Sequence, residues 1–173
     1  MNDRGVIPLP FLQNGVAQLG FVVEDLDKAV ESWWKLLGVG PWQFYTYGEP
    51  LVKKMEYRGK PARYRMRIAL SNIGPLRIEL IQPLEGDTVY AEFVKAHGYG
   101  IHHLGLLVTD MKESLAKAAA AGLAMTMDGS GFGKDGDGHY AYLDTEEKLA
   151  TTLELIQRPL GRVPPEKVYP PQG

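Results

Sequence analysis

The sequence contains no cysteine. This absence excludes disulfide bonds, thiolate metal ligands and cysteine nucleophiles together. Long apolar runs are also missing: no stretch approaches the roughly 20 residues that a membrane-spanning helix needs, and the first residues lack the apolar core of a signal peptide. We therefore expect a cytoplasmic protein that does not contact a membrane.

Neither sign of charge is in excess. The 19 lysines and arginines nearly balance 21 aspartates and glutamates, for a net charge of −2. No bulk electrostatic attraction to nucleic acid or to an anionic membrane is therefore expected. With 45% hydrophobic and 23% charged residues among 173, the composition is that of one globular domain. An enzyme or a binding protein for a small molecule is the expected class.

A repeated motif organises the chain. Four residues of a predicted strand and its exit recur 85 residues later, so that Leu19, Gly20, Val23 and Asp25 correspond to Leu104, Gly105, Val108 and Asp110. A second repeated motif, Glu-Leu-Ile-Gln, occupies residues 79–82 and 154–157. Each copy of the first motif continues into a helical pattern, with an aspartate as the predicted N-cap. Two repeats of this size indicate a duplicated module.

Each half is predicted to follow the order strand, helix, strand, strand, strand. The first module extends over about residues 16–84 and the second over about 101–158, within a single domain of residues 1–173. An N-terminal arm precedes them, and a proline-rich C-terminal tail, predicted to be extended, follows. The glycine-rich run 128–138 is predicted to be a mobile loop. It would serve as a flap over a ligand, with Phe132 as its apolar latch.

Polar residues occupy matched positions in the two modules. Gln18 corresponds to His103, and Glu79 corresponds to Glu154. Because side chains alternate along a strand, all four can converge on one concave face if each half curls its sheet around a helix. A lone glutamate in a strand usually faces solvent, but four polar residues at equivalent points of a duplication favour a ligand set. Three oxygen ligands and one imidazole nitrogen suit one divalent ion, such as zinc, cobalt, nickel or manganese.

This ligand set indicates one kind of chemistry and argues against another. Non-haem iron oxygenases need two histidines and a carboxylate, so ring-cleaving oxygenase chemistry is not expected. An oxygen-rich site suits proton abstraction next to a carbonyl, with an enediolate stabilised by the metal. A carboxylate that is loosely bound to the ion can leave it and act as the base.

The motifs resemble those of the vicinal oxygen chelate superfamily, which includes glyoxalase I, methylmalonyl-CoA epimerase, extradiol dioxygenases and bleomycin-resistance proteins. The resemblance covers about residues 16–158 and is carried by Gln18-Leu-Gly-Phe-Val-Val-Glu-Asp-Leu, Ile78-Glu-Leu-Ile-Gln-Pro, Gly100-Ile-His-His-Leu-Gly and Leu153-Glu-Leu-Ile-Gln. It implies an α+β fold of tandem βαβββ modules whose curved mixed sheets enclose a cleft. Gly-Ile-His-His is closest to the epimerase branch, whereas the order Gln, Glu, His, Glu resembles the zinc site of eukaryotic-type glyoxalase I.

The resemblance implies a metal-dependent isomerase or lyase, epimerase-like or glyoxalase-like. Its substrate would be a CoA thioester or another α-substituted carbonyl compound. The resemblance points to Glu154 as the catalytic base. A second acid or base is expected from the early half of the chain, where Glu49 and Glu56 are both candidates.

Arginines and tyrosines are the predicted substrate-binding residues. The arginines would share a face with Glu79 if two strands lie in phase, and would clamp a carboxylate or phosphate; they are Arg63, Arg65, Arg67 and Arg77. The alternative is that they form a solvated edge. Tyr140 and Tyr142 would form a wall of the same cavity.

A second function class is compatible with the resemblance. Bleomycin-resistance proteins sequester a ligand without a metal, although such proteins typically lack the ligand set present here. We also expect a homodimer. The identity of the metal and of the substrate stays open, as does whether the modules pair within one chain or across the dimer.

Overall fold

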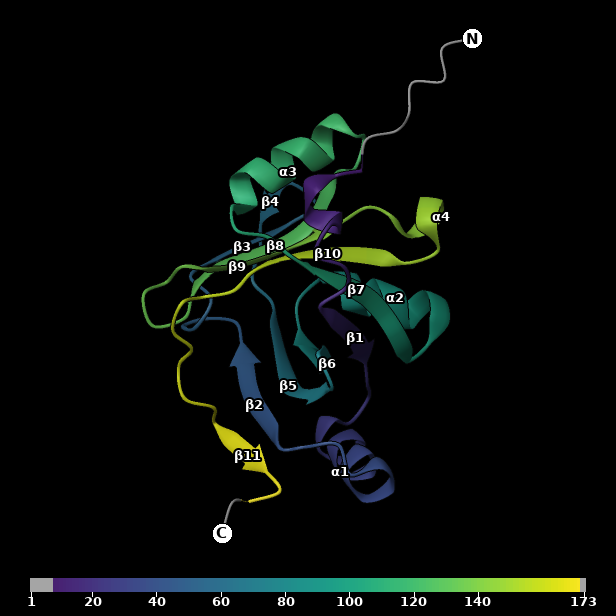
Figure 1. Ribbon diagram of the computed structural model, residues 1–173, viewed down its shortest axis with the longest axis vertical. Coiled ribbons are helices and arrows are strands. Elements are labelled where there is room, and N and C mark those ends of the chain that lie inside the picture. Colours follow the sequence, from purple (N-terminus) through teal and green to yellow (C-terminus); the bar gives the residue numbers. More distant parts are fainter. Residues whose placement is uncertain (1–7, 172–173) are drawn as a thin grey trace.

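One strongly curled sheet of eleven strands forms the frame of the protein in the computed structural model, which describes residues 8–171 (Figure 1). The strands run in the spatial order β11-β2-β5-β6-β1-β7-β10-β9-β8-β3-β4. Their bounds are β1 Gln18–Val22, β2 Trp42–Tyr47, β3 Lys54–Tyr57, β4 Lys60–Pro61, β5 Arg65–Ile73, β6 Leu76–Glu85, β7 Gly100–Leu107, β8 Met125–Phe132, β9 Gly138–Leu143, β10 Thr152–Gln157 and β11 Lys167–Tyr169.

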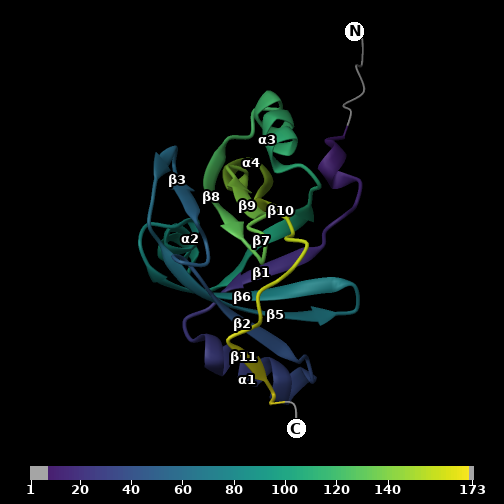
Figure 2. The same ribbon diagram turned by 90° about the vertical axis from the view of Figure 1, so that its left-hand side faces the viewer.

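The helices of the described chain are short (Figures 1 and 2). They are the 3-10 turn η1 Pro10–Leu12 and the α-helices α1 Leu26–Leu37, α2 Val89–His97, α3 Met111–Ala120 and α4 Glu146–Leu149. The aspartates of the repeated motif start α1 and α3. The Asp25 side chain accepts a hydrogen bond from the backbone nitrogen of Lys28 at 3.0 Å, and Asp110 accepts one from that of Glu113 at 2.8 Å. Each carboxylate thus satisfies a free backbone donor at a helix start.

The two halves of the sheet repeat one arrangement. In the first half β1 pairs in parallel with β6, and in the second half β7 pairs in parallel with β10. The antiparallel pairing of β1 with β7 joins the halves within one chain. The predicted α+β class, with a curled mixed sheet, is confirmed.

Three apolar clusters fill the structure. One lies beneath α1 and includes Leu26 and Leu80, and a second lies beneath α3 and includes Met111 and Leu155. The third and largest is rich in tyrosine and methionine and lies inside the curl. Each half therefore packs a helix on its outer face, and the tyrosines and methionines of the third cluster face the interior, which is where the candidate site lies.

The prediction of a mobile loop over residues 128–138 is wrong for its first five residues. β8 continues to Phe132 and is paired with β3 on one side and β9 on the other. The side chain of Phe132 is buried against Tyr47 and Tyr140. The glycines here make room for rings: a Cβ on Gly129 would lie 2.2 Å from the Tyr140 hydroxyl, and one on Gly138 would lie 2.3 Å from the Phe132 ring.

Residues 54–61 form the β3–β4 hairpin. Through β3 this hairpin joins the first half of the chain to the edge of the second half. Residues 1–7 of the predicted N-terminal arm fall outside the described residues. Among residues 8–171, no helix combines the length and the apolar character needed to cross a bilayer.

Candidate active site

The four matched polar residues lie on the four central strands of the sheet. Gln18 is on β1, Glu79 on β6, His103 on β7 and Glu154 on β10. All four are buried, with exposed fractions of 4%, 8%, 0% and 4% respectively. The structure therefore brings together the predicted ligand set from strands that are far apart in the sequence.

The repeated glycines make this convergence possible. Gly20 lies opposite His103, and Gly105 lies opposite Gln18, in the β1–β7 pairing. A Cβ on Gly20 would come within 1.9 Å of the His103 ring, and a Cβ on Gly105 would come within 2.8 Å of Gln18 Cβ. Each glycine thus leaves the space that the polar side chain of the facing strand occupies.

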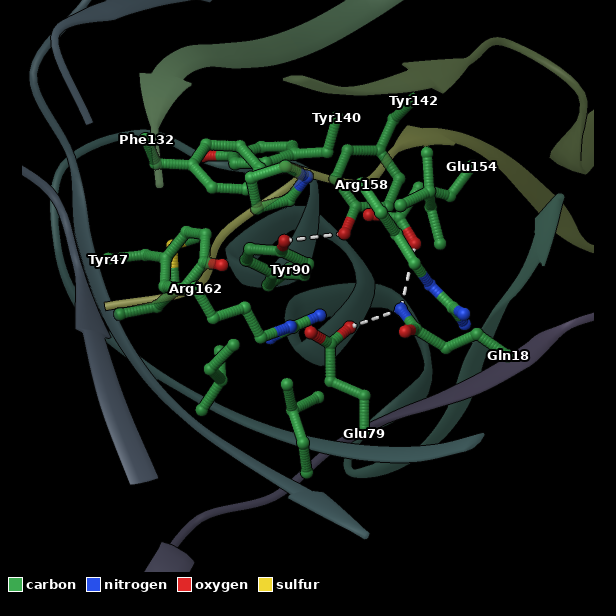
Figure 3. Close-up of a pocket in the computed structure, with 15 residues that line it drawn as sticks. Gln18, Tyr47, Glu79, Tyr90, Phe132, Tyr140, Tyr142, Glu154, Arg158 and Arg162 are labelled. Atoms are coloured by element: carbon green, nitrogen blue, oxygen red, sulfur yellow. Dashed lines mark hydrogen bonds between the residues drawn. The ribbon is translucent and has the colours of Figure 1, made fainter. Parts of the chain in front are cut away.

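The polar groups of the cluster point toward one another (Figure 3). The amide nitrogen of Gln18 donates hydrogen bonds to Glu79 Oε2 and Glu154 Oε2, each at 3.0 Å. His103 Nε2 lies 3.1 Å from Glu154 Oε2 and 3.4 Å from Glu79 Oε2. One candidate ligand atom from each of Glu79, His103 and Glu154 lies within 4.8 Å of the other two.

This donor set fits a divalent metal ion. His103 Nε2 is buried and has no hydrogen-bond partner among the described residues, a state that is costly for a polar atom. An ion among the carboxylates would supply the missing partner. The Gln18 amide presents its nitrogen to the carboxylates, and the same amide turned over would present its oxygen, because the two ends differ only by a half-turn.

The surroundings of the cluster shift the pKa values of Glu154, His103 and the neighbouring His102. Burial raises the pKa of Glu154 above the usual value for a glutamate. Burial alone would lower the pKa of His103, but the carboxylates of Glu154 and Glu79 outweigh that effect and raise it to about 9. Burial, aided by the neighbouring His103, lowers the pKa of His102 to about 2.

His102 packs against α2, with its ring against Tyr90 and Phe93. Its Nδ1 lies 3.1 Å from Nδ1 of His103. Because His102 is neutral, its Nδ1 can accept a hydrogen bond from the Nδ1–H of His103. That arrangement directs His103 Nε2 toward the carboxylates and fixes the orientation of the ring.

A small cavity of about 30 Å³ opens onto the cluster. Its walls are aromatic and are formed by Tyr47, Tyr90, Phe132, Tyr140 and Tyr142. The hydroxyls of Tyr90 and Tyr142 are hydrogen-bonded at 2.7 Å. The predicted wall residues Tyr140 and Tyr142 are therefore at the cavity. Tyr90 was not predicted because it lies on the connecting helix, outside both repeats.

Two of the predicted substrate-binding arginines lie elsewhere. Arg65 pairs with Glu85 at 2.5 Å, and Arg67 pairs with Asp27 of α1 at 2.9 Å. In the pairing of β5 with β6, it is Leu70 that lies opposite Glu79. The cavity-facing residues of β5 are consequently Met66, Ile68 and Leu70. The alternation on β5 was predicted correctly, but the arginines are on the outer face.

Of the remaining predicted residues, one lies on the same strand face as Glu79 and two lie outside the cavity. Arg77 is half-buried on β6, two residues before Glu79, and so shares its face. Glu49 is exposed beside Arg63, and Glu56 is on β3; both line a separate hollow. The structure does not bring Glu49 or Glu56 into the cavity that contains Glu154.

Two arginines of the cavity were not predicted. Arg158 and Arg162 line it, and both follow the last strand of the second module. Neither arginine has an equivalent residue in the first module, so the comparison of the two modules did not indicate them. Figure 3 shows both side chains reaching over the cavity that holds Glu79 and Gln18.

Comparison with known proteins places this geometry in a family. Residues 17–142 match the model of the glyoxalase/bleomycin resistance protein/dioxygenase superfamily. The chain belongs to this superfamily. The resemblance to the vicinal oxygen chelate group is thereby confirmed. A comparison with curated protein sequences gave no significant match.

Solved structures of the superfamily include epimerases with the same fold. Methylmalonyl-CoA epimerase from Mycobacterium tuberculosis is 20% identical, with a TM-score of 0.61 over 87% of this chain and 89% of that chain. A variant of the Streptomyces coelicolor epimerase in complex with 2-nitronate-propionyl-CoA is 19% identical, with a TM-score of 0.63 over 86% and 97%. A methylmalonyl-CoA epimerase in complex with methylmalonyl-CoA and NH4+ gives the same values. At these identities the likeness shows the fold.

Proposed function

We propose that the protein is a metal-dependent isomerase or lyase that removes a proton from the carbon next to a carbonyl, in the manner of an epimerase or a glyoxalase. One observation carries this proposal. A buried histidine nitrogen without a hydrogen-bond partner faces two buried carboxylates at the floor of an aromatic cavity. Two of the similar epimerases are described in complex with CoA thioester compounds. This supports a CoA thioester or another α-substituted carbonyl compound as substrate.

The residues of the cluster have distinct roles in this proposal. Gln18, Glu79, His103 and Glu154 would hold one divalent ion, with zinc, cobalt, nickel and manganese all compatible with the donor set. When bound, the ion supplies the positive charge that stabilises negative charge developing on the carbonyl oxygen. Glu154 accepts the proton, because burial raises its pKa and brings it closer to the pH at which a general base works best.

The tyrosines in the cavity wall remain uncharged, which assists proton transfer to Glu154. Burial raises the pKa values of Tyr90, Tyr140 and Tyr142 well above the usual value for tyrosine. Their hydroxyls therefore keep their protons and do not compete with Glu154 for the proton of the substrate. Their rings exclude water from the reacting carbon, which strengthens each electrostatic contact in the cavity.

Glu79 takes the place of Glu49 and Glu56 as the candidate for the second acid or base. Among the described residues that line the cavity, Glu79 and Glu154 are the carboxylates. They come from opposite halves of the sheet, β6 and β10, so they can approach a substrate from two directions. An epimerisation needs two such groups, whereas a lyase or a simple isomerisation can use one.

The test is metal analysis combined with proton exchange. Purified protein should hold about one divalent ion per chain, and chelation should lower its melting temperature because the ion binds only the folded state. His103→Ala should lose the ion, whereas His97→Ala, at an exposed histidine paired with Glu146, should retain it. Metal-loaded protein should also catalyse the exchange, with deuterated solvent, of the substrate proton on the carbon next to the carbonyl.

A different result would favour a ligand-sequestering protein. Full metal content in the His103→Ala protein, with an unchanged melting temperature, would contradict the proposal. So would tight ligand binding by a protein that takes up no ion and catalyses no exchange.

A further inference from the structure

The arginines within residues 8–171 fall into two groups. Those outside the cavity each lie within 4 Å of a carboxylate: Arg58, Arg63, Arg65 and Arg67 are 2.7, 3.8, 2.5 and 2.9 Å from Glu92, Glu49, Glu85 and Asp27. Across residues 8–171, no such partner is found for Arg77, Arg158 or Arg162. Two of these three, Arg158 and Arg162, line the cavity, and Arg77 lies on β6 two residues before Glu79.

These three side chains lie close enough to affect one another. Burial, together with the nearby charges of Arg162 and Arg158, lowers the pKa of Arg77 to about 10 against the opposing effect of Glu79. Arg158 is shifted in the same direction by burial and by Arg162. Like charges gathered in this way repel one another unless an anion is bound, and guanidinium groups are well suited to binding carboxylates and phosphates.

The chain holds two of these arginines in place. Residues 158–163, here called the strap, leave β10 and cross toward β2 (Figure 2). On one side the backbone nitrogen of Leu160 donates to Asp137 at 2.9 Å, and that of Lys134 donates to Gly161 at 2.8 Å. Beyond the strap, Glu166 accepts a hydrogen bond from Thr46 of β2 at 2.8 Å. Anchors at both ends position Arg158 and Arg162 over the cavity.

The charge of the cavity is unbalanced when the metal site is filled. The carboxylates of Glu79 and Glu154 neutralise a divalent ion, and the neighbouring tyrosines are neutral. The positive charges of the three arginines remain. A neutral substrate would leave them unpaired, whereas a carboxylate could accept paired hydrogen bonds from a guanidinium.

We propose that Arg77, Arg158 and Arg162 form an anion site, and that the substrate is a small carbonyl compound carrying a carboxylate close to the reacting carbon. This inference rests on the proposed function for the identity of the reacting carbon. Arg158 and Arg162 line the same cavity as Glu79 and Glu154, so the anion lies within a few bonds of that carbon. This position fits a carboxylate of the acyl group and does not fit the phosphates at the far end of a CoA thioester.

Calorimetric titration with three probes tests the proposal. Malonate presents the small dianion, malonamide is its neutral counterpart, and adenosine 3′,5′-bisphosphate represents the phosphates of CoA. Each is titrated into zinc-loaded protein and into chelator-treated protein. Malonate should bind at least about tenfold more tightly than malonamide in both forms, because a hydrogen bond to a charged group contributes a factor of about ten or more.

Matched variants assign the binding to the arginines. Arg162→Gln and Arg158→Gln should each weaken malonate binding about tenfold or more without changing the zinc content. Arg162→Lys keeps the charge and should restore part of the affinity; it also replaces Arg162→Gln if that variant melts at a lower temperature. Arg67→Gln, at a paired arginine on the outer face, should bind malonate as the wild type does.

Equal affinity for malonate and malonamide, or wild-type malonate affinity in Arg158→Gln and Arg162→Gln, would overturn the anion site. Arginine-dependent binding of adenosine bisphosphate alone would overturn the assignment to a carboxylate. The chelator-treated arm separates this inference from the proposed function. If the protein took up no zinc, the proposed function would fail, while arginine-dependent malonate binding would still support the anion site.

Discussion

Replacing Gly20 with alanine tests the geometry of the site with a single methyl group. Built on the native backbone, the new Cβ would lie 1.9 Å from His103 Cε1, 2.3 Å from Nε2 and 2.4 Å from Nδ1. No carbon approaches another atom so closely without displacement. The ring is fully buried, with Tyr142 packed against it, so it has little room to move aside.

The expected cost is that of overpacking a buried site, about 1–3 kcal/mol. For a protein of this size, that cost lowers the melting temperature by roughly 2–12 °C. The displaced ring should also cost the protein its divalent ion, since His103 Nε2 would leave the position facing Glu79 and Glu154. Thermal melting of the chelated protein gives the first quantity, and metal analysis gives the second.

A double-mutant cycle identifies His103 as the cause. In a His103→Ala background the three atoms nearest to the new Cβ are gone, so Gly20→Ala should then change the melting temperature very little. Gly105→Ala should cost less than Gly20→Ala, because the atom it approaches most closely is the terminal Cδ1 of Ile156, at 2.7 Å. An equal cost of Gly20→Ala with and without the histidine ring would refute this account.

Four further predictions concern the cavity. Glu154→Gln should keep much of the metal but lower proton exchange next to the carbonyl by about 10²–10⁴-fold; wild-type exchange with metal bound would place the base elsewhere. Because the pKa of His103 is raised to about 9 in the metal-free protein, binding must displace its proton, so zinc affinity should rise from pH 7 to pH 8 by up to about tenfold; a competition assay with no pH dependence would contradict this. In the metal-free protein, the stability supplied by protonated His103 should be present below its unfolded pKa of about 6.5 and lost as the pH rises through about 9. Phe132→Ala should lower the stability by about 3–5 kcal/mol, because the ring is buried between Tyr47 and Tyr140; a change near zero in denaturant unfolding would restore the mobile-loop interpretation.

The duplication made the centre of the fold predictable from the sequence. Gln18 and His103 occupy equivalent points of two modules, and equivalent points of paired modules are related by the same rotation in space. Together with the alternation of side chains along a strand, this was enough to predict that four polar residues meet. The glycines beside them carried the same information, since each leaves room for the polar side chain opposite.

The position of the β5 arginines was not predictable, because it depends on register. Arg65 and Arg67 alternate correctly with Met66 and Ile68, but the sequence does not say which set turns inward. A shift of one residue in the pairing of β5 with β6 exchanges the two faces. The observed register places Leu70 opposite Glu79, which turns the arginines toward the outer helix. Apolar burial favours this choice, since the inward set joins the largest core cluster.

The duplicated scaffold gives Glu79 and Glu154 equivalent places, so any difference between them must arise from what surrounds them. Arg77 precedes Glu79 by two residues and shares its face, whereas the matching residue before Glu154 is Thr152, which is uncharged. Burial disfavours the ionised form of a carboxylate, and it raises the pKa of Glu154 despite the opposing effect of the nearby His103. The strap then adds Arg158 and Arg162 over a cavity whose two halves were otherwise alike. A symmetric pair of ligands thus acquires an asymmetric setting, in which Glu154 is the stronger candidate for the base and the side of the cavity near Arg158 and Arg162 is the place for a substrate carboxylate.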